Sequence, residues 1–98
     1  MSGALEIQEQ PHYVYRLIGK RGRVLYIGCT MNLDGRLAEH RRHLRYGHLI
    51  ASVEVDGPFG FAAARSLERE SIAIANPPFN TEWTPRDQRT TKRRRATA

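Results

Sequence analysis

The first third of the chain alternates apolar and polar residues in two runs that predict a β-hairpin. Residues 12–19 (HYVYRLIG) and 23–29 (RVLYIGC) are rich in Tyr, Val, Leu and Ile, as strands are. The link at residues 19–22 (GKRG) begins and ends with glycine, which is typical of a turn. Two strands joined by so short a link predict an antiparallel pair.

A helical pattern follows the hairpin. The helix is predicted to begin at Asn32 and to run to about His43, because the Asn32 side chain can accept a hydrogen bond from an early backbone N–H. Asp34 favours the same start, since a negative charge is stabilised at the N-terminal end of a helix. Gly35 costs this helix about 1 kcal/mol relative to alanine, and we interpret it as leaving space rather than as a break.

The remaining elements predict the fold class. Residues 50–55 (IASVEV) predict a third strand that the tripeptide DGP closes, and a second helix is expected from residue 59 or 60 to about residue 75. Residues 76–80 (NPPFN) end this helix, because proline cannot continue its hydrogen-bond ladder. The order ββαβα predicts an α+β fold, in which helices flank a small three-stranded antiparallel sheet.

Length and composition favour one small domain. The 98 residues suit a single core, which we place at residues 11–85, between a flexible segment at 1–10 and a tail at 86–98. The chain lacks a run of about 18 apolar residues, so no membrane span is predicted. The polar N-terminus does not resemble a secretory signal. The single cysteine excludes an intramolecular disulfide and favours a reducing compartment, the cytoplasm of a bacterial or phage-type system.

The positive charge is concentrated in the tail. The chain has a formal net charge of +6, of which residues 86–98 contribute +5 through six basic side chains and one acid. We interpret this tail as a disordered basic arm. Such an arm suits nucleic acid, because each contact with a phosphate releases counterions, although a solubilising tail would have the same composition.

A histidine and an arginine lie on the apolar side of the predicted first helix. At 100° per residue, an apolar stripe is formed by Leu33, Leu37 and Leu44. His40 lies within the stripe and Arg36 at its edge, one turn apart. Both side chains are expected to face the domain or a cleft in it. Each also has an ordinary structural interpretation, so neither indicates a function alone.

A carboxylate occupies the apolar side of the predicted second helix. The apolar arc of this helix consists of Phe61, Ala63, Ala64, Leu67, Ile72, Ile74 and Ala75. Glu68 lies inside the arc, whereas Glu70 lies only at its far edge. A carboxylate that faces the core is costly unless it is paired or binds a metal ion. Two explanations of this position of Glu68 therefore remain, a buried ion pair with Arg36 and a metal site.

Together these side chains meet the needs of phosphodiester hydrolysis with one metal ion. A single carboxylate can hold Mg²⁺ when water and substrate oxygens complete its coordination. A guanidinium can stabilise the charge of a pentavalent phosphate, and a tyrosine or histidine can take a proton from the attacking water. We therefore interpret Arg36, His40 and Glu68, with a tyrosine, as parts of one site.

The same residues resemble the motifs of the GIY-YIG nucleases. Val14-Tyr15 stands where that family has IY, and residues 26–28 match YIG, with ten residues between the two motif tyrosines as the family requires. Arg36 matches the catalytic arginine of the family. His40, one helical turn further, stands where the family has a histidine or a tyrosine.

The second half of the chain continues the resemblance. Glu68 matches the metal-binding glutamate of the family, and Ile72 occupies the apolar position four residues later. Asn80 matches the asparagine that closes the motif, at the spacing of the nuclease domain in the bacterial excinuclease, and we expect it to brace the metal site and the helix end. The resemblance covers roughly residues 12–82 and implies the GIY-YIG fold.

The resemblance implies a DNA endonuclease with a single Mg²⁺ or Mn²⁺ site. Glu68 would hold the metal, and Arg36 would stabilise the developing charge. Tyr15 or Tyr26 would act as the general base or orient the attacking water, with His40 assisting. The implied catalytic residues are Tyr15, Tyr26, Arg36, His40, Glu68 and Asn80.

Two positions depart from the family pattern. Tyr13 replaces the glycine of GIY, where it would either crowd the site or change only the strand edge. Cys29 stands where some members have lysine. We expect a small cysteine that is buried or half-buried rather than a nucleophile, since no partnered base is evident. Neither change removes the arginine or the metal ligand.

DNA is the expected partner of this chain. Basic residues that could contact phosphate, or belong to a solvated charged face, are Lys20, Arg21, Arg23, Arg41, Arg42, Arg45, Lys92, Arg93, Arg94 and Arg95. A protein partner that targets DNA is expected for so small a unit, which would be a monomer or weak dimer. The alternative is a non-catalytic DNA-binding or adaptor module with the same fold. A basic structural protein would explain the tail but not Glu68.

Overall fold

The computed structural model describes residues 10–80 of the chain. Apart from residue 10, the segment expected at 1–10 lies outside the described residues. The end of the domain expected at 11–85 and the whole tail at 86–98, with its candidate phosphate contacts at residues 92–95, also lie outside them. Within the described part, no helix is both long and apolar enough to cross a membrane.

Three antiparallel strands form the sheet at the centre of the fold. They are β1 (His12–Ile18), β2 (Val24–Thr30) and β3 (Ser52–Phe59), in the spatial order β2-β1-β3. β1 therefore pairs with both neighbours, and its alternating apolar side chains are buried on both faces. The predicted hairpin and the predicted α+β fold class are confirmed.

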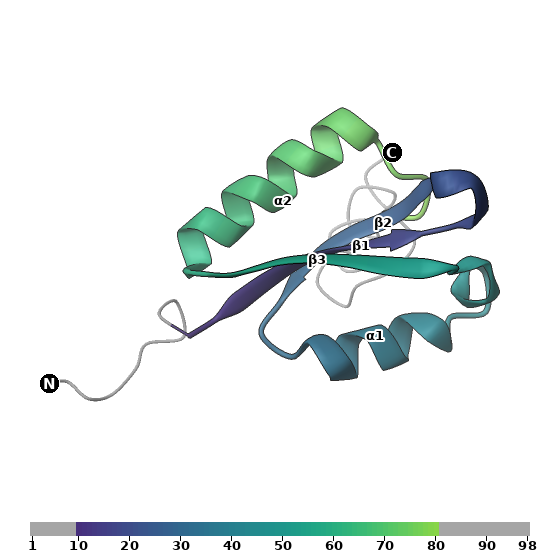
Figure 1. Cartoon of the computed structure of the whole chain (residues 1–98), viewed down its shortest axis with the longest axis horizontal. Coiled ribbons are helices and arrows are strands. Elements are labelled where there is room, and N and C mark those ends of the chain that lie inside the picture. The colour runs from purple at the N-terminus through teal and green to yellow at the C-terminus, as the bar shows by residue number, and fades with distance from the viewer. Residues whose placement is uncertain (1–9, 81–98) are drawn as a thin grey trace, which may run out of the picture.

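One helix covers each face of the sheet (Figure 1). Helix α1 (Leu33–Arg41) follows β2, and helix α2 (Phe61–Ala75) follows β3, whereas two short 3₁₀ turns lie at η2 (Lys20–Gly22) and η3 (Gly47–Leu49). The element order matches the predicted ββαβα order. The sheet is thus the middle of three layers, so side chains from the two helices can meet only where they reach past a strand.

The first helix begins as its sequence predicts. Asn32 is the N-cap, and its side-chain oxygen accepts a hydrogen bond from the backbone N–H of Gly35 at 3.2 Å. A side chain at Gly35 would collide with the capping amide of Asn32. The space that this glycine leaves is therefore used by the cap itself.

The third strand is longer than predicted. The prediction ended it before Asp56, whereas β3 continues through Gly57 and Pro58 to Phe59. Proline, which has no backbone N–H, is tolerated there because β3 is an edge strand. On its outer side an edge strand needs no N–H for pairing with a neighbouring strand. A shift in the pairing register between His12 and Val14 of β1 accommodates the irregular segment.

The predicted apolar faces of both helices were too wide. α1 ends at Arg41 rather than near residue 43, and Leu44, which was placed on its apolar stripe, is 94% exposed. Ile74, near the end of α2, is 87% exposed, and Ala63 and Ala75 are exposed as well. Once α1 has ended, the chain turns back on itself, and Tyr46 takes the place in the core that the prediction gave to Leu44.

Two apolar clusters hold the layers together. The cluster on the α1 face contains buried Tyr15, Leu17, Leu25, Tyr26 and Tyr46, against which side chains of α1 pack. The cluster on the α2 face contains buried Val14, Ile27 and Ala64, packed by Leu67 and Ile72 from the same helix and by the half-buried Cys29 of β2. The expectation of a buried or half-buried cysteine is confirmed.

A pair of leucine substitutions tests the observed end of α1. Leu37→Ala is expected to lower the free energy of unfolding by about 1–2 kcal/mol, because Leu37 packs against the core. Leu44→Ala is the matched control and should change it by less than about 0.5 kcal/mol, since its side chain is solvated. Urea denaturation measures both values. Equal losses would contradict the observed helix end.

Candidate active site

A buried chain of hydrogen bonds joins three side chains on the α1 face of the sheet. The hydroxyl of Tyr15 lies 2.7 Å from Nε2 of His40, and Nδ1 of His40 lies 2.6 Å from the hydroxyl of Tyr46. All three residues are fully buried. In a neutral imidazole one nitrogen donates and the other accepts. One tyrosine therefore donates to the ring, and the other accepts from it.

The second motif tyrosine completes an aromatic cluster around this chain. The ring of Tyr26 lies 4.4 Å from that of His40, centroid to centroid, and 6.2 Å from each of the rings of Tyr15 and Tyr46. We call these four residues the aromatic cluster. Its members come from β1, β2, α1 and the turn before η3, so the cluster forms only in the complete fold.

Gly28 of β2 determines where the Tyr15 hydroxyl lies. Tyr15 and Gly28 are opposite each other in the β1–β2 pair, and a Cβ atom at Gly28 would overlap the hydroxyl and ring carbons of Tyr15. The phenol ring therefore lies directly over the backbone of β2. This close approach explains in physical terms why the YIG-like stretch has a glycine in this position.

Arg36 and Glu68, on the helices that cover opposite faces of the sheet, both influence the Tyr15 hydroxyl. Burial raises the pKa of Tyr15 above its ordinary value of 10.0; Arg36 opposes this rise through its charge and a hydrogen bond, whereas the charges of Tyr46 and Glu68 add to it. Arg36 belongs to α1 and Glu68 to α2. The side chains of Arg36 and Glu68, which the sequence assigned to one site, thus both act electrostatically on Tyr15.

Both charged residues are accessible to solvent. The side chains of Arg36 and Glu68 are 26% and 21% exposed, respectively. Arg36 Nε lies 3.6 Å from a carboxylate oxygen of Glu39 on the same helix, and Arg65 Nε lies 3.5 Å from a carboxylate oxygen of Glu68. The Glu68 carboxylate is therefore neither enclosed in the core nor fully solvated, so that an ion from solvent can reach it.

The environment of His40 favours its neutral form. Burial lowers the pKa of His40 from 6.5 to about 4, and the positive charge of Arg36 and the neighbouring His43 act in the same direction. Tyr15 is also neutral near pH 7, since its ordinary pKa of 10.0 is raised further. The hydrogen bond between Tyr15 and His40 thus joins two neutral groups at physiological pH.

Asn80 is hydrogen-bonded to the backbone of β2. Its side-chain oxygen accepts a hydrogen bond from the backbone N–H of Ile27, and its side-chain nitrogen donates to the carbonyl of Ile27, both at 2.8 Å. The backbone N–H of Phe79 donates to the carbonyl of Leu25 at 3.1 Å. Asn80 therefore holds the segment after α2 along the free edge of β2.

A metal site built from several protein ligands does not occur in the described part of the chain. Residues 10–80 contain no group of three or more His, Cys, Asp or Glu side chains that could hold an ion together. Glu68 is the carboxylate whose charge acts on the Tyr15 hydroxyl. One carboxylate with open positions is a donor set that suits Mg²⁺, which retains several waters and takes substrate phosphate oxygens as further ligands.

The basic side chains expected to contact phosphate form two exposed groups. Those in the hairpin turn and those near the C-terminal end of α1 are Lys20, Arg21, Arg23, Arg41, Arg42 and Arg45. Tyr13, which replaces the family glycine, is only half-buried. It lies next to Gly57 of β3, near the start of the central strand β1.

Tyr46 is the site residue that the sequence did not reveal. Its sequence context, RYGHL, predicts a turn, and turns rarely supply a fully buried side chain. The available signal was a large aromatic residue within a polar turn, six residues after His40. Gly47 explains the turn geometry, because a Cβ there would collide with the backbone of Arg41.

A substitution at Gly28 tests the contact with Tyr15. Gly28→Ala is expected to lower the free energy of unfolding by about 1–3 kcal/mol, because the new methyl group must displace the buried phenol. Gly60→Ala is the control, since no atom lies within 4 Å of a Cβ there, and it should be neutral or slightly stabilising. Chemical denaturation of both variants gives the comparison.

The protonation of His40 predicts a pH dependence of stability. The unfolded chain binds a proton at His40 near pH 6.5, whereas the folded chain binds it only near pH 4. The free energy of unfolding should therefore fall as the pH is lowered from about 6.5 to 4. NMR titration of the imidazole and urea denaturation against pH measure the two effects. His40→Gln should flatten the dependence, and an imidazole that titrates near pH 6.5 would contradict it.

Comparison with known proteins places this site in a family. The GIY-YIG catalytic domain matches residues 11–75. The chain is also 31% identical over 74 residues to the UvrABC system protein C of Hahella chejuensis (strain KCTC 2396), a match that covers 68% of this chain and 12% of the relative. The chain thus spans a small part of that protein's length. Because the family match includes most of the chain and both motif tyrosines, this protein belongs to the GIY-YIG family.

Proposed function

We propose that this chain is a metal-dependent endonuclease that hydrolyses phosphodiester bonds in DNA with a single Mg²⁺ or Mn²⁺. The observation that carries the proposal is that Arg36 and Glu68 both interact electrostatically with Tyr15, while both charged side chains are partly exposed to solvent. A cation and an anion that both act on one hydroxyl suit the transition state of phosphoryl transfer.

Glu68 would hold the metal ion. A divalent ion bound there would neutralise charge on the scissile phosphate and on the leaving oxygen. Arg65, at 3.5 Å, is a competing partner of this carboxylate and is itself 38% exposed. An exposed ion pair is weak, so Arg65 can yield the carboxylate to the metal ion.

Arg36 would bind the phosphate and stabilise the charge that develops during attack. Its guanidinium has several N–H donors, of which the contact with Glu39 uses one end. Glu39 therefore orients Arg36 along α1, and Arg36 also interacts with Tyr15 through its charge and a hydrogen bond. A bidentate contact with phosphate is the geometry for which arginine is suited.

Tyr15 and His40 would move the proton of the attacking water. With its raised pKa, Tyr15 is not a preformed tyrosinate. The phenol oxygen would accept a proton from water while the phenol proton passes to Nε2 of His40, 2.7 Å away. This transfer requires Nδ1 of His40 to carry the hydrogen that is donated to Tyr46. Tyr26, whose ring lies 4.4 Å from that of His40 in a tilted arrangement, stays the second candidate for the base.

A non-catalytic DNA-binding or adaptor module is the second candidate function. The observation that favours it is the burial of all the groups proposed to move protons, since Tyr15 and His40 expose no surface and Tyr26 exposes 1%. In such a module the aromatic cluster would be structural, and the exposed basic groups would supply the DNA contacts.

A protein partner is part of the proposal. The relative from Hahella chejuensis is named as a component of the UvrABC system, and this chain matches a small part of it. We propose that the chain acts in the cytoplasm, where another protein directs it to DNA, and that it is a monomer or weak dimer.

Substitutions in the site distinguish the two candidate functions. Glu68→Gln should reduce plasmid nicking in Mg²⁺ or Mn²⁺ to background, because the metal ligand is lost, and Arg36→Lys should slow it by about 10²–10³-fold. Arg65→Gln is the control, since it removes a partner of Glu68 without removing a proposed catalytic group. Agarose gels of supercoiled, nicked and linear plasmid give the rates. If folded wild-type protein binds DNA but nicks it in neither Mg²⁺ nor Mn²⁺, the endonuclease proposal is wrong and the non-catalytic DNA-binding or adaptor module is favoured.

A further inference from the structure

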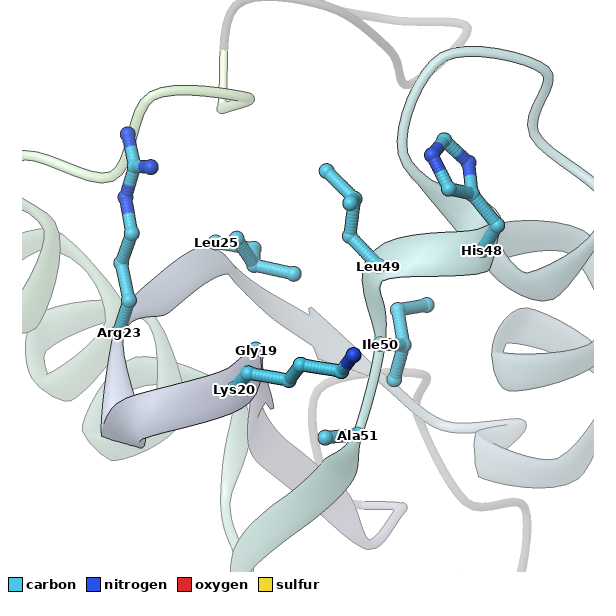
Figure 2. A pocket seen from close by; sticks show the side chains of 8 residues that line it. All are labelled: Gly19, Lys20, Arg23, Leu25, His48, Leu49, Ile50 and Ala51. Carbon is cyan, nitrogen blue, oxygen red and sulfur yellow. The ribbon is translucent and has the colours of Figure 1, made fainter.

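A second polar feature lies beside the aromatic cluster, at the hairpin end of the sheet. A pocket of about 380 Å³ opens between the β1–β2 turn and the segment that leads into β3 (Figure 2). Its rim carries three basic side chains, which are Lys20, Arg23 and His48. Its floor is aliphatic and consists of Leu25, Leu49 and Ile50. The proposed catalysis uses none of them.

The arrangement of these side chains points to a ligand with two parts. Figure 2 shows Arg23 and His48 on opposite sides of the pocket, with Lys20 extended toward Ile50 below them. None of the lining residues is acidic, so the rim attracts an anion. Leu49 is 39% exposed. A ligand that covered it would gain from the burial of apolar surface.

The pocket and the candidate active site share parts of the fold. Leu25 precedes Tyr26 on β2 and belongs to the same buried cluster as Tyr15, and Ile50 packs against that cluster. His48 follows Tyr46 by two residues. A strand of nucleic acid bound at the site would therefore have the pocket close beside it.

We infer that this pocket binds an unpaired nucleotide of a nucleic-acid strand, with its phosphate at the basic rim and its base against Leu25, Leu49 and Ile50. The inference rests on the proposed function for the presence of DNA at the site. In a duplex the bases are stacked and a protein meets mainly the backbone and the groove edges. Only an unpaired base can turn its face onto an aliphatic floor.

The inference names a substrate class for the site. Duplex DNA would use the basic rim alone, whereas DNA with a single-stranded segment would use both the rim and the floor. The chain is thus expected to prefer branched, flapped or overhanging DNA over blunt duplex.

Binding without metal tests this preference separately from cleavage. Fluorescence anisotropy in EDTA would compare a duplex that has a single-stranded end with a blunt duplex of equal phosphate count. We expect the overhang to bind about fivefold more tightly. Because no turnover occurs in EDTA, an inactive protein gives the same result, and failure of the proposed catalysis does not affect the test.

Matched variants separate the pocket from general charge attraction. Leu49→Asn should remove the preference for the overhang while the affinity for blunt duplex stays unchanged. Lys20→Gln should weaken binding of the overhang more than binding of the blunt duplex. Arg21→Gln is the control, because Arg21 is exposed in the same turn but does not line the pocket, and it should weaken both probes equally.

Three results would overturn the inference. They are equal affinity of the wild type for the two probes, retention of the preference in Leu49→Asn, and an equal effect of Lys20→Gln and Arg21→Gln. A free mononucleotide that competes as well as the overhang would assign the pocket to a small molecule instead. Circular dichroism of each variant verifies that the fold is intact.

Discussion

The imidazole of His40 is the point on which the candidate site depends, because it is a polar group in the core with both nitrogens engaged. Its partners, Tyr15 and Tyr46, come from segments that are far apart in sequence. An unpaired imidazole nitrogen in such a place would be costly, so each partner fixes the position of the others. The same hydrogen bonds that anchor α1 to the sheet therefore set the position and the direction of the ring.

The pairing of β1 with β2 provides the second constraint on the candidate site. Tyr15 can extend over β2 only because Gly28 has no side chain, and this extension brings its hydroxyl within the influence of Glu68 on the other side of the sheet. Fold and site are thus the same set of contacts. A larger residue at position 28 would displace the Tyr15 ring from the backbone of β2.

Much of this arrangement could be predicted from local patterns, because caps, alternation and helical spacing depend on near neighbours. The Asn32 cap, the hairpin and the inward direction of His40 are of this kind. Tyr46 and the true end of β3 were not predictable in this way. Tyr46 is buried because a turn folds back onto the sheet, and β3 extends through Pro58 because β1 offers it a partner. Both depend on contacts between distant segments, which no local pattern records.

The pairing of Asn80 with Ile27 has a consequence for how the sheet meets other chains. Its amide imitates a peptide group of a neighbouring strand and occupies the outward N–H and C=O of Ile27 at the middle of the β2 edge. On the opposite edge, β3 carries Pro58, and Glu54 and Asp56 beside it are paired with Arg16. Proline and charge both discourage the addition of a further strand. Both edge strands of this small sheet therefore disfavour pairing with a strand of a second copy. The two helical faces and the end of the sheet that carries the pocket are left for binding other molecules.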